Sequence, residues 1–228
     1  LRKRGNQRCE RCGDRTGHEP MLARASAPAA VGSLRGACQT RPVPLPLPIH
    51  DWPLPYEARL AERSAATVDL VVIHCTELPD LATARQFGER VLYDSGSGNS
   101  GHFYIDRDGS VHRFVSPQRV AHHTRGYNQR AVGIELVNRG RWPDWLDSRR
   151  QAMTEPYTAA QIDALLALLR QLRQDLPTLH YIAGHEDLDT DEVAASDDAT
   201  QRVRRKRDPG PLFPWERLES SGLQRLRP

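Results

Sequence analysis

The sequence lacks the long apolar runs of a membrane protein. No stretch of its 228 residues approaches the ~18 consecutive apolar residues that a membrane-spanning helix needs, and its mean hydropathy of -0.64 indicates a polar surface. It also lacks a strong charge of one sign, because 32 basic and 29 acidic side chains leave a formal net charge of +3. With aromatic residues at only 6%, this balance predicts no nucleic-acid partner.

Cysteine is scarce, and its spacing does not indicate a disulfide framework. Cys9 and Cys12 have the spacing of half a zinc knuckle and His18 follows them, but no second Cys-x-x-Cys pair completes a four-ligand set. Cys75 lies inside an apolar run and is expected to be a small buried hydrophobe. The cysteines therefore predict no structural metal site of their own.

Residues 1–66 differ in composition from the remainder, and we expect a disordered or signal and linker segment. The small and apolar residues from Met21 to Cys38 are similar to a bacterial lipoprotein signal, although two arginines interrupt them. The proline-rich stretch 42–55 predicts an extended spacer. Two interpretations stay open: a lipid-anchored Cys38 followed by a stiff linker, or an unprocessed tail, with Met21 as an alternative start to Leu1.

The hydrophobic pattern from residue 67 onward predicts an α/β domain built on a mixed sheet. Asp80 is a candidate cap for a helix running to about Tyr93. Thr158-Ala-Ala-Gln161 is a capping box that opens a second helix. The turn sequence 106–110 predicts a hairpin. The expected strands are residues 68–73, 102–105, 111–115, 131–137 and 179–183.

Two histidines stand directly after the apolar residues of predicted strands. His74 ends Val-Val-Ile-His, and His185 follows Tyr-Ile-Ala-Gly. Strand ends and the loops after them build the binding crevices of α/β sheets. Either histidine alone would more often be structural, but together with Asp208 they could form a two-histidine, one-carboxylate zinc site. Three protein ligands leave the fourth zinc position open, as in catalytic sites.

Six motifs then appear in order: Val-Ile-His74-Cys-Thr-Glu, Gly101-His-Phe-Tyr-Ile-Asp-Arg-Asp-Gly109, Ala121-His-His-Thr, Gly133-Ile-Glu-Leu-Val-Asn138, Gly184-His-Glu-Asp187 and Lys206-Arg-Asp-Pro-Gly-Pro211. Together they resemble the type-2 N-acetylmuramoyl-L-alanine amidases, the bacterial relatives of peptidoglycan recognition proteins. The resemblance covers about residues 68–216 and is greatest to the outer-membrane lipoprotein branch. It implies a peptidoglycan-recognition-protein-like fold, a mixed central β-sheet flanked by α-helices, with residues 67–228 as the zinc amidase catalytic domain.

The resemblance also implies roles for individual residues. One zinc ion per chain would be held by His74, His185 and Asp208. Glu135 would move the proton and Lys206 would stabilise the negatively charged oxygen that develops during hydrolysis. Substrate-groove positions fall on Thr76, His102 and His123.

The implied reaction is hydrolysis of the amide bond between N-acetylmuramic acid and L-alanine, in peptidoglycan or its fragments, during cell-wall turnover or recycling. The implied protein is a periplasmic monomer, either free or anchored as an outer-membrane lipoprotein, with a cytoplasmic recycling enzyme as the alternative. A non-catalytic peptidoglycan-binding module and another zinc peptidase are the rival functions, although no His-Glu-x-x-His motif supports a peptidase.

Two features depart from the family pattern. The gap between His185 and Asp208 is 23 residues (208 − 185), longer than in the family, and its acidic part, residues 186–198, is expected to be a flexible loop near the site. His122 stands where relatives often carry tryptophan, which predicts weaker stacking against a sugar.

Overall fold

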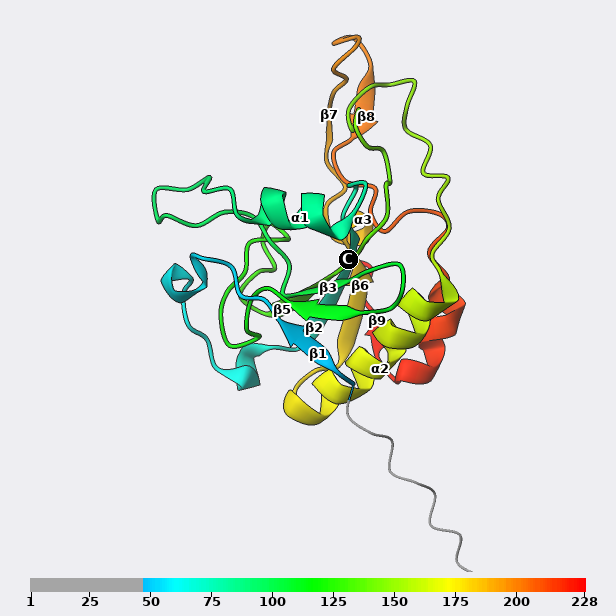
Figure 1. The fold of residues 1–228 in the computed structure, drawn as a ribbon. Helices are drawn as coiled ribbons and strands as arrows, with labels where there is room; N and C mark the ends of the chain where they lie inside the picture. The colour runs from blue at the N-terminus through cyan, green and yellow to red at the C-terminus, as the bar shows by residue number, and fades with distance from the viewer. Residues whose placement is uncertain (1–46) are drawn as a thin grey trace, which may run out of the picture. The chain divides into compact units, whose positions relative to one another are not determined.

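A computed structural model describes residues 47–228, so the predictions for Cys9, Cys12 and Cys38 lie outside the described residues. A seven-stranded mixed sheet, in the order β1-β4-β3-β5-β2-β6-β9, forms the centre of this part of the chain (Figure 1). Neighbouring strands are parallel, except for the antiparallel hairpin of β3 and β4. The predicted α/β class and the predicted hairpin are therefore confirmed.

The sheet is formed by β1 (Ile49–Asp51), β2 (Leu70–Cys75), β3 (Phe103–Ile105), β4 (Val111–Arg113), β5 (Ala131–Leu136), β6 (Tyr181–Gly184) and β9 (Gln224–Arg225). A separate two-stranded sheet joins β7 (Glu192–Ala194) to β8 (Arg202–Arg204). The helices are α1 (Leu81–Gly88), α2 (Ala159–Asp175) and α3 (His185–Leu188), with 3₁₀ turns at Glu57–Arg59, Ala65–Thr67 and Trp215–Ser221.

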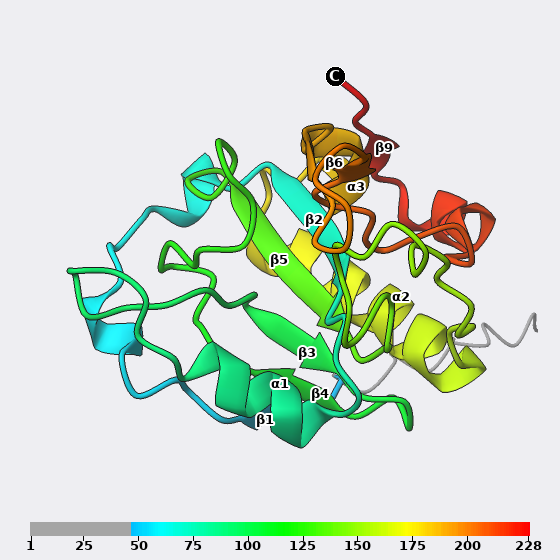
Figure 2. The same cartoon turned by 90° about the horizontal axis from the view of Figure 1, so that it is seen from above.

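Alternation of side chains gives the two faces of the sheet different characters. Alternate apolar residues of β2 and β5, such as Val71, Ile73 and Ile134, pack with α2 in the larger core. Their sequence neighbours point to the opposite face. Helices α1 and α2 lie on opposite sides of the sheet (Figure 1 and Figure 2). His74 and Glu135 are direct partners in the parallel register of β2 and β5. The two polar residues therefore share the face that α2 does not cover, at the carboxyl end of the sheet.

Local sequence explains the two longer helices. Asp80 accepts a hydrogen bond from Thr83 N at 2.7 Å and caps α1. The capping box at the start of α2 is formed in both directions, by Thr158 and Gln161. However, α1 ends at Gly88 rather than near Tyr93, and the next residues, Val91 to Tyr93, are exposed.

The expected boundary at residue 67 is wrong, because the fold begins about 20 residues earlier. β1 pairs in parallel with β4, from Ile49 opposite Val111 to Asp51 opposite Arg113. Leu54, Tyr56 and Leu60 are at most 4% exposed. The prolines of the stretch 42–55 predicted an extended spacer. An edge strand such as β1 tolerates neighbouring prolines, and the apolar residues that follow β1 are buried.

The insertion between His185 and Asp208 is also more ordered than expected. Instead of a flexible loop it forms the β7–β8 hairpin, which extends away from the sheet beyond α3 (Figure 1).

Among residues 47–228, no helix combines the length and apolar character needed to cross a bilayer.

Candidate metal centre

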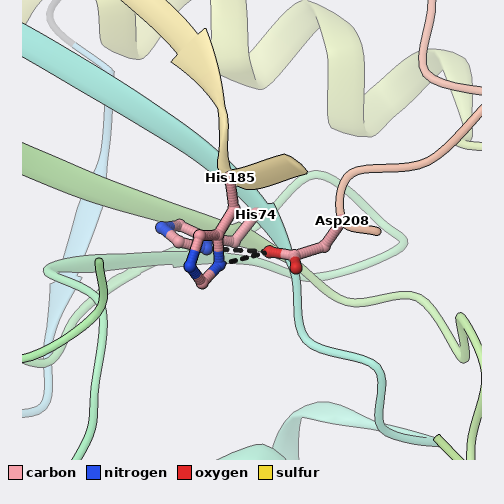
Figure 3. Close-up of side chains that lie close together, drawn as sticks. All are labelled: His74, His185 and Asp208. Carbon is pink, nitrogen blue, oxygen red and sulfur yellow. Dashed lines mark hydrogen bonds and ion pairs between the residues drawn. The ribbon is translucent and has the colours of Figure 1, made fainter. Parts of the chain in front are cut away.

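Three predicted ligands converge at the carboxyl ends of β2 and β6. His74 is near the end of β2, His185 follows β6 directly, and Asp208 comes from the segment after β8. The Nδ1 atoms of His74 and His185 lie 2.9 and 3.1 Å from Oδ2 of Asp208 (Figure 3). One candidate ligand atom from each residue lies within 4.8 Å of the others, and all three residues are buried.

The donor set suits a divalent cation. Two imidazoles and one carboxylate are the ligand types of catalytic zinc sites. Within the described residues, Oδ1 of Asp208 and Nε2 of His185 are buried without a hydrogen-bond partner, which is costly unless a cation compensates the carboxylate. Burial, with repulsion from His185, lowers the pKa of His74 to about 4, so its lone pair is free at neutral pH. Burial alone would raise the pKa of Asp208, but the attraction and hydrogen bonds of His185 and His74 hold that pKa well below its usual value.

His123 orients the first of these ligands. When Nδ1 of His74 faces the centre, its Nε2 carries the proton and donates to Nδ1 of His123 at 3.1 Å. Nε2 of His123 in turn faces the carbonyl oxygen of Ala131 at 3.4 Å. Such outer hydrogen bonds fix the ring and tautomer of a metal ligand. Gly133 provides the space, since a Cβ there would lie 2.7 Å from the His123 ring.

Glu135 and Lys206 border the same cavity. Oε1 of Glu135 lies 4.0 Å from Nδ1 of His74, and 14% of the Glu135 side chain is exposed, so solvent or a ligand can reach it. Burial, reinforced by the negative charge of Asp208, raises the pKa of Glu135 well above its usual value, whereas Lys206 opposes the shift. The pair places a proton acceptor and a fixed positive charge beside the candidate metal centre.

The cavity has a volume of about 750 Å³, which is within the range of small-molecule sites. Its wall contains an aromatic pair, Tyr93 and His122, with ring centroids 5.0 Å apart. Tyr93 donates a hydrogen bond to Oδ1 of Asn99 and is 43% exposed. Arg125 and Arg205, near the β7–β8 hairpin, also line the cavity. Apolar, aromatic and basic surfaces therefore all border the same space.

Two of the three predicted groove residues border this cavity, and one does not. Thr76 and His123 line it. His102 is fully buried and is not part of the lining, which corrects the expectation that it contacts substrate. Its Nδ1 accepts from Gly133 N at 3.0 Å, and its Nε2 donates to the carbonyl oxygen of Arg119 at 3.0 Å. Burial, with the adjacent charge of Arg63, lowers its pKa to about 3, so it is a neutral structural residue.

The acidic insertion contains further carboxylates, and two of them are paired with other side chains. Asp189 is buried and ion-paired with Arg205, with Arg125 at 3.6 Å. Asp197 accepts hydrogen bonds from Ser148. These carboxylates are not part of the convergent cluster, which leaves Asp208 as its carboxylate.

Sequence reasoning missed a buried ion pair beside the site. Glu77 and Arg141 both line the cavity and are joined by two hydrogen bonds, of 2.6 and 2.9 Å. Arginine side chains are mostly exposed in proteins, whereas Arg141 is 3% exposed. The sequence signal that could have placed Glu77 beside the site is its position three residues after His74.

A family model described as N-acetylmuramoyl-L-alanine amidase matches residues 64–211. The N-acetylmuramoyl-L-alanine amidase AmiD of Escherichia coli K12 is 38% identical over 96 residues, 42% of this chain and 29% of that protein. The endolysin of Enterobacteria phage K11 is 32% identical over 85 residues, 37% of this chain and 52% of that protein. The matched region therefore spans less than two thirds of either relative.

Solved structures show the same fold. A crystal structure of AmpD has a TM-score of 0.55 at 22% identity, covering 76% of this chain and 93% of that one. The endolysin amidase LysCS from Clostridium intestinale has a TM-score of 0.52 at 21% identity, with coverage of 78% and 98%. AmiD from E. coli, solved with anhydro-N-acetylmuramic acid-L-Ala-D-gamma-Glu-L-Lys, has a TM-score of 0.50 at 24% identity, with coverage of 72% and 61%.

Proposed function

Because the chain belongs to the N-acetylmuramoyl-L-alanine amidase family, we propose that it is a zinc-dependent hydrolase of the amide bond between N-acetylmuramic acid and L-alanine. Its substrate is peptidoglycan or a muropeptide released from it. The observation that carries the proposal is the convergence of two histidines and an aspartate on one point. A carboxylate and a lysine border the same cavity.

One zinc ion per chain would be held by His74, His185 and Asp208, whose donor atoms and burial fit it. When bound, zinc lowers the pKa of a water molecule and polarises a carbonyl group. His74 is presented to the ion in a fixed orientation by His123. Burial lowers the pKa of His74, and the two histidines hold the pKa of Asp208 low, so these two ligands are deprotonated as metal binding requires.

Glu135 is the proton carrier. Its carboxylate accepts the proton of the attacking water and then donates that proton to the nitrogen that leaves with L-alanine. The second transfer matters because an amide nitrogen is a poor leaving group until it is protonated. A pKa raised by burial suits this role, since the group must both accept and release a proton near neutral pH.

Lys206 supplies positive charge where negative charge develops. It lies two residues before Asp208 and borders the cavity. Its ammonium would stabilise the negatively charged oxygen of the tetrahedral intermediate, an interaction stronger in the transition state than in the ground state.

The cavity wall indicates how the substrate is held. Tyr93 and His122 present a partly exposed aromatic surface, which suits the apolar face of a saccharide ring. Tyr93 comes from the loop after α1 and would compensate for the histidine at position 122. Thr76 and His123 contribute polar atoms to the same cavity. We assign no substrate contact to His102.

We further propose that the domain is a monomer that works in the periplasm, tethered through a lipidated Cys38. The signal-like sequence before Cys38 supports this proposal, and the alternative is a cytosolic recycling enzyme. Cys38 precedes the first residue of β1, Ile49, by 11 residues (49 − 38). Fatty-acid labelling and cell fractionation of wild type and Cys38→Ser test it. Unlabelled, cytosolic protein in both cases would refute the tether.

The proposed activity is tested on a defined muramyl peptide. Zinc-loaded protein should release one new amino group, that of L-alanine, whereas Glu135→Gln should bind zinc and release almost none. Binding of the muramyl peptide without release would identify a non-catalytic recognition module instead.

A further inference from the structure

Arg141 connects two segments that carry the active site. Its Nε and Nη2 donate to the carboxylate of Glu77, at 2.6 and 2.9 Å. Its Nη1 and Nη2 also donate to the backbone carbonyls of Arg204 and Arg205, at 2.9 and 3.3 Å. Gln151 accepts a further hydrogen bond from Nη1 at 3.2 Å. The five N–H groups of this guanidinium thus have five acceptors, on three parts of the chain.

The Glu77 end of this bridge lies in the loop after β2, three residues from His74. Glu77 has a left-handed backbone (φ 49°), which is uncommon for a residue other than glycine. Its carbonyl oxygen accepts a hydrogen bond from Nε1 of Trp145 at 3.0 Å. The loop is therefore held in a specific conformation in which Glu77 faces Arg141.

The other end lies directly before Lys206 and Asp208. The chain reaches these residues only after the 23-residue excursion from His185 through the β7–β8 hairpin. Arg204 bonds back to the carbonyl oxygens of Glu186 and Asp189, at 2.7 and 3.2 Å. The contacts of Arg204 fix the segment before Lys206 to the start of the insertion. Arg141 fixes the same segment to the loop that follows His74.

We propose that Arg141 is a positioning residue: its buried guanidinium, paired with Glu77, sets Asp208 and Lys206 in register with His74. The proposal rests on the proposed function, because it assumes that these three residues hold zinc and stabilise the reaction. A lysine cannot replace the arginine fully, since a single ammonium lacks the planar fork that bonds two carboxylate oxygens and two carbonyl oxygens together.

The test compares Arg141→Lys and Glu77→Gln with the control Arg149→Ala. Arg149 also connects to the insertion, through Asp197 at 3.3 Å, but its side chain is 75% exposed. Zinc affinity is measured by competition with a chromophoric chelator, and kcat and KM are measured on a soluble muropeptide. Loss of a direct hydrogen-bonding partner of a metal ligand typically changes metal affinity by ~10–100-fold; Arg141 acts through Glu77 and the backbone before Lys206, so we expect the lower end of that range.

For Arg141→Lys we expect zinc affinity to fall about 10-fold and kcat to fall more than KM rises, because Tyr93 and His122, to which substrate binding is assigned, are unchanged. Glu77→Gln keeps the shape and one acceptor oxygen and should show the same pattern more weakly. The control should match wild type in all three quantities. If Arg141→Lys does not fold, as judged by near-ultraviolet circular dichroism, the same comparison is made with Glu77→Gln.

Folded variants with wild-type zinc affinity and kcat would overturn the proposal, as would loss of folding in both variants, which would make the pair a stability element only. A wild-type protein that neither binds zinc nor cleaves the muropeptide would instead refute the proposed function. The two failures are therefore distinguishable.

Discussion

Substitution of Gly133 by alanine should disturb the candidate metal centre through His123. Gly133 lies in the middle of β5 and is buried. A Cβ at this position would lie 2.7 Å from Cγ and Nδ1 of His123 and 3.0 Å from its Cδ2, whereas ordinary contacts begin near 3.4 Å. The His123 ring must therefore move by about 0.7 Å (3.4 − 2.7) or the strand must yield.

Two measurable consequences follow from this displacement. Overpacking of a filled interior costs about 1–3 kcal/mol, so urea unfolding of the metal-free protein should show a loss of this size. The 3.1 Å hydrogen bond between His123 Nδ1 and His74 Nε2 should also lengthen beyond bonding distance. Because that bond orients a ligand, zinc affinity should fall by about 10-fold or more.

Gly88→Ala is the matched control, because a Cβ at Gly88 meets its nearest atom, on Leu54, at 3.5 Å. Gly88 ends α1, where alanine is the better helix former, so the free energy of unfolding should be unchanged or slightly increased. Gly133→Ala with the unfolding free energy and the zinc affinity of the control would refute the assigned role of His123.

Three further substitutions test the roles assigned to Glu135, His102 and Tyr93. Glu135→Gln should retain full zinc occupancy and lose activity by ~10²-fold or more, as judged by metal analysis and kcat; near wild-type hydrolysis would remove Glu135 from the mechanism. The pKa of His102 is lowered by burial to about 3, so the folded state binds fewer protons than the unfolded state below about pH 6.5. Stability should therefore decline as pH falls, by up to about 1.4 kcal/mol per pH unit from this residue. In metal-free protein, urea unfolding of His102→Gln should show a shallower decline between pH 6.5 and 4, and an identical slope would contradict the assignment. Tyr93→Ala should raise KM several-fold for a muropeptide and leave kcat nearly unchanged if the Tyr93 ring contacts the sugar; an unchanged KM would exclude that contact.

The sheet and the two converging histidines could be predicted because their signals are local. β2 is apolar at every position up to His74, and parallel strands end at the same edge, so His74 and His185 were expected to approach each other. The capping box at Thr158 likewise determined where α2 begins. These features depend on short-range patterns that tertiary contacts reinforce.

Other features depend on contacts between distant segments and could not be predicted from local patterns. The prolines near Leu54 predicted a spacer, whereas the preceding residues form the edge strand β1, which is stabilised by pairing with β4. His102 belongs to a matching motif, yet its side chain is buried against Gly133. Arg141 is one of many arginines, and only the fold shows that it meets a carboxylate and two carbonyl groups.

The most direct test of the central claim is digestion of purified peptidoglycan sacculi, with the fragments identified by mass spectrometry. Zinc-loaded protein should release stem peptides with a free L-alanine amino terminus and leave intact glycan carrying unsubstituted N-acetylmuramic acid, and His185→Ala should release none. Cleavage between two amino acids of the stem peptide, or equal release by His185→Ala, would contradict the account.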